Sequence, residues 1–466
     1  MTFPGSAPKF AEFVGQWMSR QRWFANKGSL PAIEIVGSWG MRAQDPTVEI
    51  ATLLLLDHTP GKSALYQVPL VHRLVEAPDA VGLIGEFENR FVYDAPHDAA
   101  YTSALLTLVT GERVVRGDRM LASGHRSTGD VASSIAQSDF TSRVLAGEQS
   151  NTSIIFEPTS LRADAAPTVS VMCKLFRTIH DGENPDVQLQ SALAAAGSTA
   201  VPQPIGHVRA EWNDKTAPFG RARGHLVCAQ EFLPGAQDAW TLALEAASSG
   251  ADFASEARAM GVVTAQIHAT LAATLPTRAT DVDDVESILQ RMNGRLRDAI
   301  AEVPDLERFA TGLAKIFERA RIVEWPAQQR AHGDLHLGQV LAVPDRGWVV
   351  VDFEGEPLRP MSERVLLDSP MRDVAGMLRS FDYAAGSVAM SEETIHPLSW
   401  VDAARAAFIA GYVEAAGADI LENSALIDAF EVDKALYETV YEARNRPAWL
   451  PIPVAAIERL AARFVD

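Results

Sequence analysis

From residue 238 onward the sequence is a succession of helical patterns that an irregular stretch, 326–357, interrupts. Apolar residues recur with helical spacing in seven segments, which are 253–275, 282–301, 304–323, 370–386, 401–416, 424–445 and 453–464. The interruption holds two short apolar runs, 340–343 and 348–353, of the length that is typical of strands. This part of the chain is therefore predicted to be a helical domain that carries one strand hairpin.

Strand-like runs dominate the residues before 235. They are 32–38, 47–57, 64–74, 152–157, 168–177, 203–210 and 225–233. Helical patterns occur at 10–17, 98–110 and 186–196. Small polar residues at 122–138 predict a linker. We therefore expect an α+β fold with three parts, a cap (1–125), a β-rich lobe (126–235) and a helical lobe (236–466).

Composition excludes several classes of protein. The net charge of −19 disfavours nonspecific binding to nucleic acid or to anionic membranes. The two cysteines, Cys173 and Cys228, are too few for a disulfide framework and are expected to be reduced core thiols. No signal peptide is evident, and the apolar runs are far shorter than the roughly 20 residues of a membrane helix. We expect a cytoplasmic protein.

The densest site signal is the sequence AHGDLHLGQ at 331–339, followed by Asp352 after an apolar run. Phosphoryl transfer needs a carboxylate that accepts or orients the proton of the attacking hydroxyl, and oxygen ligands that hold Mg²⁺ against the phosphates. Asp334 can supply the first, while Gln339 and Asp352 can supply the second. This spacing predicts a phosphotransferase site that uses ATP and Mg²⁺.

Two other interpretations of the same motif stay open. His332 and His336 are four residues apart, a spacing that can hold zinc on a helix. Gly333 and Gly338 oppose a helix here, however, and Mg²⁺ prefers the oxygen atoms on offer. The loop can also be purely structural.

The nucleotide needs a cation as well. Lys174 stands in an apolar strand-like run shortly before a helical pattern, the chain order of a lysine that binds nucleotide phosphates. An exposed lysine on an edge strand is the alternative. Ser150, in the loop 147–153, is a further phosphate-binding candidate, although this loop can also be an ordinary hairpin turn. Glu231 and Leu233 precede the helical lobe, where backbone groups could bind adenine or merely connect two domains.

One face of the helix predicted at 424–445 carries Lys434, Tyr437, Glu438 and Tyr441. Hydroxyls and rings on one face suit a sugar, which they would bind by hydrogen bonds and stacking. A structural face of salt bridges fits the pattern equally well. We also expect His332, His336 and Glu354, which flank the catalytic residues in sequence, to contact the substrate.

Together these motifs make the chain similar to a known family. The segments that carry the similarity are SRQRWFANKG (19–28), GEQSNTSIIF (147–156), NPDVQL (184–189), HGDLHLGQVL (332–341), DFEGEP (352–357), DSPMRDVAGMLRSFDYAA (368–385) and KALYETVYEARNRPAWLPIP (434–453). The sequence resembles the actinobacterial maltokinases, within the aminoglycoside-phosphotransferase-like superfamily. The resemblance covers nearly the whole chain and implies a bilobal, protein-kinase-like fold with an N-terminal cap.

The resemblance implies ATP-dependent transfer of phosphate to the anomeric hydroxyl of maltose, which yields maltose 1-phosphate for α-glucan or glycogen synthesis. It implies that Asp334 is the catalytic base, that Gln339 and Asp352 bind Mg²⁺ and that Lys174 binds phosphate. A trehalose synthase is a candidate partner. Alternatives are a glucosamine or aminoglycoside kinase, and a nucleotide-binding regulator without catalysis, which the presence of all three acidic and amide residues disfavours.

The sequence departs from the family at one position that bears on the lysine. The family often has Glu where Gln188 stands, and Gln cannot form the ion pair of a kinase-like Lys–Glu couple. Glu183 or Asp186 could replace it, or the ion pair is absent.

Overall fold

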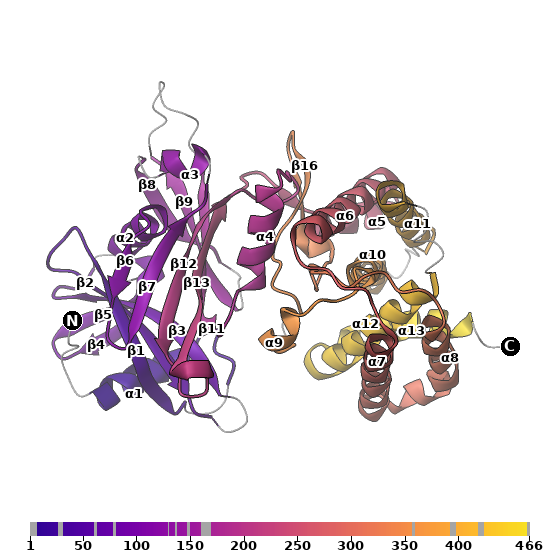
Figure 1. The fold of residues 1–466 in the computed structure, drawn as a ribbon, viewed down its shortest axis with the longest axis horizontal. Coiled ribbons are helices and arrows are strands. Elements are labelled where there is room, and N and C mark those ends of the chain that lie inside the picture. Colours follow the sequence, from indigo (N-terminus) through magenta and orange to yellow (C-terminus); the bar gives the residue numbers. More distant parts are fainter. Residues whose placement is uncertain are drawn as a thin grey trace. The chain divides into compact units, whose positions relative to one another are not determined.

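The computed structural model describes residues 7–26, 31–59, 63–77, 81–128, 130–135, 138–146, 150–159, 169–356, 359–391, 398–417 and 424–463. The chain forms two compact units. The first comprises Met1–Val187 and Pro202–Pro234, and the second comprises Gln188–Val201 and Gly235–Asp466. Figure 1 shows both units and labels most of their helices and strands.

The first unit contains two antiparallel sheets. One has the strand order β1-β2-β3-β5-β4, with β11 paired to β3. Its strands are β1 (Ile33–Arg42), β2 (Glu49–Asp57), β3 (Ala64–Arg73), β4 (Leu83–Phe87), β5 (Arg90–Asp94) and β11 (Thr178–Ile179). The other has the order β6-β7-β12-β13-β10-β9-β8. Its strands are β6 (Val114–Arg116), β7 (Met120–Arg126), β12 (Pro204–Asn213), β13 (Arg221–Glu231), β10 (Val171–Phe176), β9 (Asn151–Pro158) and β8 (Phe140–Val144).

Three helices accompany these sheets, α1 (Ala7–Met18), α2 (Ala99–Thr110) and α3 (Asp130–Ile135). The prediction of a linker at 122–138 is wrong, because β7 and α3 occupy most of it. The small residues there serve close packing. A Cβ atom on Gly124 would lie 1.9 Å from the carbonyl oxygen of Leu108, so only glycine lets β7 approach α2 this closely.

Buried polar side chains join the two sheets of the first unit. The Arg177 guanidinium, which is fully buried, donates to Asp94 at 2.7 Å and to Thr152 at 2.9 Å. The Gln67 amide donates to the carbonyls of Phe176 and Leu226. The predicted cap and β-rich lobe are therefore connected through buried hydrogen bonds, which are costly to break.

The second unit is helical apart from a small sheet of β14 (Gln237–Asp238), β15 (Val340–Val343) and β16 (Gly347–Val350). Its helices are α5 (Ala239–Ser249), α6 (Ala254–Thr274), α7 (Val282–Glu302), α8 (Ala310–Arg321), α9 (Met361–Arg364), α10 (Met371–Ser391), α11 (Leu398–Ala416), α12 (Ser424–Asn445) and α13 (Pro451–Ala462). Helix α4 (Pro185–Ala195) begins in the first unit and continues into the second.

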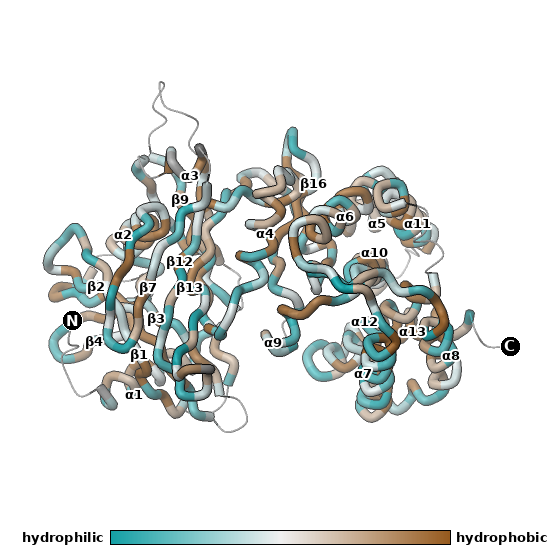
Figure 2. Tube along the Cα trace, in the orientation of Figure 1, coloured by the Kyte–Doolittle hydropathy of each residue, from teal (hydrophilic) through white to brown (hydrophobic). Residues whose placement is uncertain are grey.

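Local sequence explains these helices well. The capping box of Asp281 and Asp284 begins α7, an amphipathic helix on which Figure 2 shows both hydrophilic and hydrophobic residues. Glycines allow α6 and α11 to pack closely, since a Cβ on Gly411 would lie 2.0 Å from the carbonyl oxygen of Arg258. None of the helices that the structure describes has the length and apolar character needed to span a membrane.

Candidate active site

The loop that carries Asp334 is fixed by a buried aspartate. Asp373, in the first turn of α10, accepts hydrogen bonds from the backbone N–H groups of His332 and Gly333, each at 2.8 Å. His268 lies 3.0 Å from the Asp373 carboxylate and 2.8 Å from the Tyr412 hydroxyl. Burial alone would raise the pKa of Asp373, but these hydrogen bonds and charges hold it below the ordinary value.

His332 helps to shape this loop rather than to face a ligand. Its side chain is buried, with Nε2 2.9 Å from the carbonyl oxygen of Val351 and Nδ1 accepting from the Asp334 N–H. The ring also lies against Phe353. His336 accepts a hydrogen bond from the Gly338 N–H through Nδ1. Backbone partners thus occupy ring nitrogens of both histidines, which disfavours the zinc interpretation and, for His332, the expected contact with substrate.

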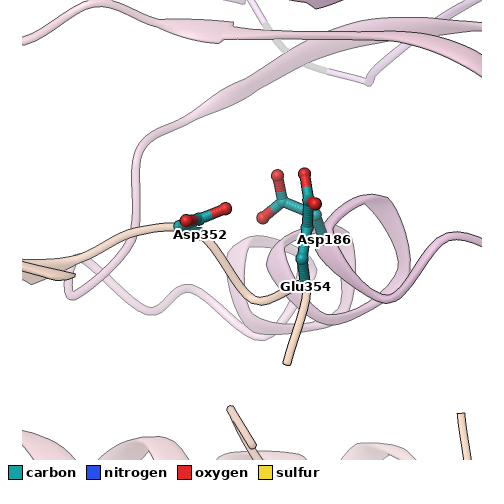
Figure 3. Close-up of side chains that lie close together, drawn as sticks. All are labelled: Asp186, Asp352 and Glu354. Atoms are coloured by element: carbon teal, nitrogen blue, oxygen red, sulfur yellow. The ribbon is translucent and has the colours of Figure 1, made fainter. Parts of the chain in front are cut away.

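Polar side chains with oxygen atoms lie close together where β16 ends. Asp352 has a φ of 67°, a strained conformation for a residue with a side chain, and its Oδ2 accepts from the Gln339 amide at 2.9 Å. One carboxylate oxygen of Asp352 and one of Glu354 lie within 4.8 Å of each other. Figure 3 shows both side chains on the loop after β16, and Asp186 on helix α4. Two carboxylates and an amide form a donor set that suits Mg²⁺.

Lys174 has an acidic partner in the first unit. Its ammonium lies 3.3 Å from the carboxylate of Asp186, and the two side chains are 12% and 2% exposed. Asn184 orients the first turn of α4 by accepting from the Asp186 N–H at 2.8 Å. Glu183 instead pairs with Arg209. Of the three residues considered from the sequence, Asp186 is therefore the one that the structure pairs with Lys174.

Lys434 on α12 reaches Asp334. Its ammonium donates to Asp334 Oδ1 at 2.9 Å and to Glu356 Oε1 at 2.7 Å. Burial alone would lower the pKa of Lys434, but the two carboxylates hold it above the ordinary value. Burial would likewise raise the pKa of Glu356, yet Lys434 and then Arg372 hold it at about 2. Asp334, Lys434 and Glu356 thus form one charged group.

The rest of the α12 face is divided between two roles. Glu438 accepts from the Arg379 guanidinium at 2.7 Å and 3.0 Å, so it belongs to a buried ion pair. The Tyr437 ring lies under the Lys434 ammonium, 5.1 Å from the ring centroid, and stays half-buried. Tyr441 is covered by the guanidinium of Arg446. Glu438 therefore takes part in a buried ion pair, whereas Tyr437 borders the charged group around Asp334.

The predicted nucleotide-binding positions lie at the ends of strands. Glu231 is the last residue of β13, and its carboxylate accepts from the Gln203 N–H at 3.2 Å. Leu233 follows it and is half-buried, and Ser150 is exposed directly before β9. Residues 147–149 of the predicted phosphate loop lie outside the described residues.

Sequence reasoning missed Asp373, His268 and Glu356. Asp373 and His268 both stand inside apolar helical patterns, which predicts that they are buried. A buried polar side chain needs hydrogen-bond partners, and this was the signal that could have found them. Glu356 stood within the DFEGEP segment but had no distinguishing pattern. Its pairing with Lys434 depends on two segments that are 78 residues apart.

Known proteins resemble this chain over most of its length. A glucosamine kinase of Streptacidiphilus jiangxiensis is 29% identical over 302 residues, 61% of this chain and 67% of the relative. One of Mycolicibacterium smegmatis is 29% identical over 307 residues, 60% of this chain and 73% of the relative. A solved glucosamine kinase in complex with glucosamine, ADP and inorganic phosphate has a TM-score of 0.64 at 21% identity, covering 98% of this chain and 100% of that one. The fold is therefore shared.

Family models match two segments. Residues 17–98 match the maltokinase N-terminal cap domain, which confirms the predicted cap. Residues 184–424, more than half of the chain, match the phosphotransferase enzyme family and contain Asp334, Gln339 and Asp352. The predicted kinase-like fold is thus confirmed, and the chain belongs to the phosphotransferase enzyme family.

Proposed function

We propose that this phosphotransferase is an ATP-dependent maltokinase, which transfers the γ-phosphoryl group of ATP to the anomeric hydroxyl of maltose. The product would be maltose 1-phosphate. The match of residues 17–98 to a maltokinase cap domain supports this substrate, and so does the charge arrangement around Asp334. The proposal places the enzyme in the cytoplasm, with α-glucan synthesis as the consumer of its product and a trehalose synthase as a candidate partner.

In this proposal each residue has a defined role. Asp334 accepts the proton of the anomeric hydroxyl as that oxygen attacks phosphorus, a role for which the Asp373 contacts hold its loop in place. Lys174, held by Asp186, binds the phosphates of ATP. Gln339, Asp352 and Glu354 would hold Mg²⁺, which neutralises charge on the phosphates when bound. The Gln339 amide would have to turn its oxygen toward the ion, because its nitrogen now faces Asp352.

The pairing of Lys434 with Asp334 and Glu356 is the observation that carries the choice of acceptor. One ammonium contacts both carboxylates, and the Arg379 guanidinium contacts Glu438. An acceptor hydroxyl beside Asp334 therefore meets a fixed cation. A protonated amino sugar would be repelled by it, while a neutral sugar would gain a hydrogen-bond donor.

Glucosamine is the second candidate acceptor, because two relatives and the solved neighbour are glucosamine kinases. An ammonium-bearing sugar would need an uncompensated carboxylate near the acceptor. Asp334, Glu356 and Glu438 each already contact a cation, which disfavours this acceptor.

A coupled assay of ADP release with maltose, glucose, glucosamine and trehalose at equal concentration tests the proposal. We expect the highest kcat/KM for maltose. A higher kcat/KM for glucosamine would contradict maltose as the acceptor but would leave the proposed kinase activity standing. No turnover with any sugar would overturn both.

A further inference from the structure

A groove of about 860 Å³ lies in the first unit, remote in sequence from every residue given a catalytic role. Its lining residues come from the end of β1 and the stretch that follows it, and from α2. Arg113, just before β6, also lines it. Its volume falls within the range of about 300–1,000 Å³ that is usual for small-molecule sites.

Two arginines that lack acidic partners line this groove. Neither Arg42 nor Arg113 forms an ion pair with any residue that the structure describes, and both are exposed. A smaller cavity of about 200 Å³ shares Gly40 with the groove and adds Arg116, which is likewise unpaired among those residues. These arginines offer local positive charge to an anion, beside the carboxylates of Asp45 in the groove and of Asp118, which pairs with Arg119, in the smaller cavity.

The other lining groups suit a ligand with hydroxyls. Helix α2 presents Ser103 and Thr107, both exposed, among alanines that leave space beside the helix. The Asp45 carboxylate is bound by Thr47 through Oδ1, and these hydrogen bonds lower its pKa, so it stays an acceptor at neutral pH. Hydroxyl and carboxylate groups beside guanidinium groups match the mixed chemistry of a sugar and its phosphate.

The side chain of Trp39, which lines the adjoining cavity, is a second observation in favour of a bound ligand. Trp39 lines that cavity and is 3% exposed, and its indole N–H has no acceptor among the described residues. A buried N–H without an acceptor is unfavourable unless water or a ligand supplies one.

We propose that the groove formed by β1, α2 and Arg113 is a binding site for a phosphorylated sugar, with Arg42 and Arg113 on the phosphate and Ser103, Thr107 and Asp45 on the hydroxyls. None of the residues that line this groove has a role in the proposed reaction. It gives the cap a function in sensing a sugar phosphate, the class of compound to which the product of the proposed reaction belongs.

Isothermal titration with glucose 1-phosphate tests this proposal without any turnover. The variants are the full chain with Arg42→Gln and Arg113→Gln combined, and the matched control Arg126→Gln, an exposed arginine on β7 outside the groove. We expect the wild type and Arg126→Gln to bind alike. The double variant should bind at least about tenfold more weakly, because hydrogen bonds to charged groups contribute strongly.

Two further titrations assign the binding to the groove. Asp352→Ala, which alters the active site, should bind glucose 1-phosphate as the wild type does, and neutral glucose should bind far more weakly. The proposal is overturned if the wild type does not bind glucose 1-phosphate at millimolar concentration, or if Asp352→Ala rather than the arginine variant abolishes binding. Binding of an oligoglutamate peptide without binding of glucose 1-phosphate would also overturn it, since the groove would then be a protein-docking surface. Failure to phosphorylate maltose would leave these titrations unaffected.

Discussion

The Lys434 ammonium lies 2.9 Å from the carboxylate of Asp334, although the two residues are 100 positions apart in the sequence. Both side chains keep some contact with solvent, at 16% and 18% exposure, whereas Glu356 on the other side of the ammonium is 1% exposed. Glu356 therefore holds the lysine from the interior, and Lys434 presents its charge where the proposed acceptor hydroxyl would bind. The base and the cation act on the same substrate atoms in the proposed reaction.

Asp334→Asn should lower kcat for maltose by about 10²-fold or more, because the amide cannot accept the proton of the attacking hydroxyl. Binding of ATP should hardly change, since the phosphates are assigned to other residues. Steady-state kinetics together with titration of ATP measure both quantities. Near-normal turnover of the variant would remove Asp334 from the role of base.

Lys434→Met should reduce both turnover and stability. Stability should fall by about 3 kcal/mol, because Glu356 is left buried without its partner. The double variant Lys434→Met/Glu356→Gln should recover most of that stability but none of the activity, as the cation beside Asp334 is still absent. Urea denaturation and maltose kinetics separate the two effects. Recovery of activity in the double variant would show that Lys434 serves only the fold.

The pairing of Lys174 with Asp186 should control the use of ATP. Lys174→Met and Asp186→Asn should each raise KM for ATP by about tenfold, and the double variant should be little worse than either, since the two act as one unit. Glu183→Gln is the matched control. Because Glu183 pairs with Arg209, this substitution should leave KM for ATP unchanged. Strictly additive effects of the two substitutions would contradict the assigned pairing.

Most helices and several strands could be predicted from local pattern, because helix periodicity and capping act over a few residues. The contact of Gln339 with Asp352 also follows from sequence, since the β15–β16 hairpin returns the chain to where it began. The strand β7 could not be recognised, because its small residues are explained only by the helix α2 that packs against Gly124. Such packing involves residues from another segment and cannot be predicted from the local sequence.

Polar contacts between residues far apart in the sequence could not be predicted either. Helical spacing placed Lys434 and Glu438 on one face but could not tell a sugar-binding face from an ionic one. The structure gives each of them a partner of opposite charge, because Arg379 lies against Glu438 and Asp334 lies against Lys434. Those partners come from other segments, and no pattern within α12 encodes them.

The pKa of Glu356 predicts how stability depends on pH. Its folded value of about 2 is below the ordinary 4.5, so the ionised form favours the fold. This contribution is fully present above about pH 4.5 and is lost as the pH falls through the folded pKa. The lowering of the Glu356 pKa from 4.5 to about 2 corresponds to a contribution of about 3 kcal/mol to the free energy of unfolding.

Urea denaturation of the wild type and Glu356→Gln between pH 7 and pH 3 measures this contribution as the difference in free energy of unfolding. We expect a constant difference from pH 7 to about pH 5, and a decrease to roughly half by pH 3 as the carboxylate of the wild type becomes protonated. Lys434 keeps its bond to Asp334 in the variant, which preserves the rest of the charged group. A difference that disappears already at pH 6, or that stays constant down to pH 3, would show that Glu356 is not held in its ionised form by Lys434.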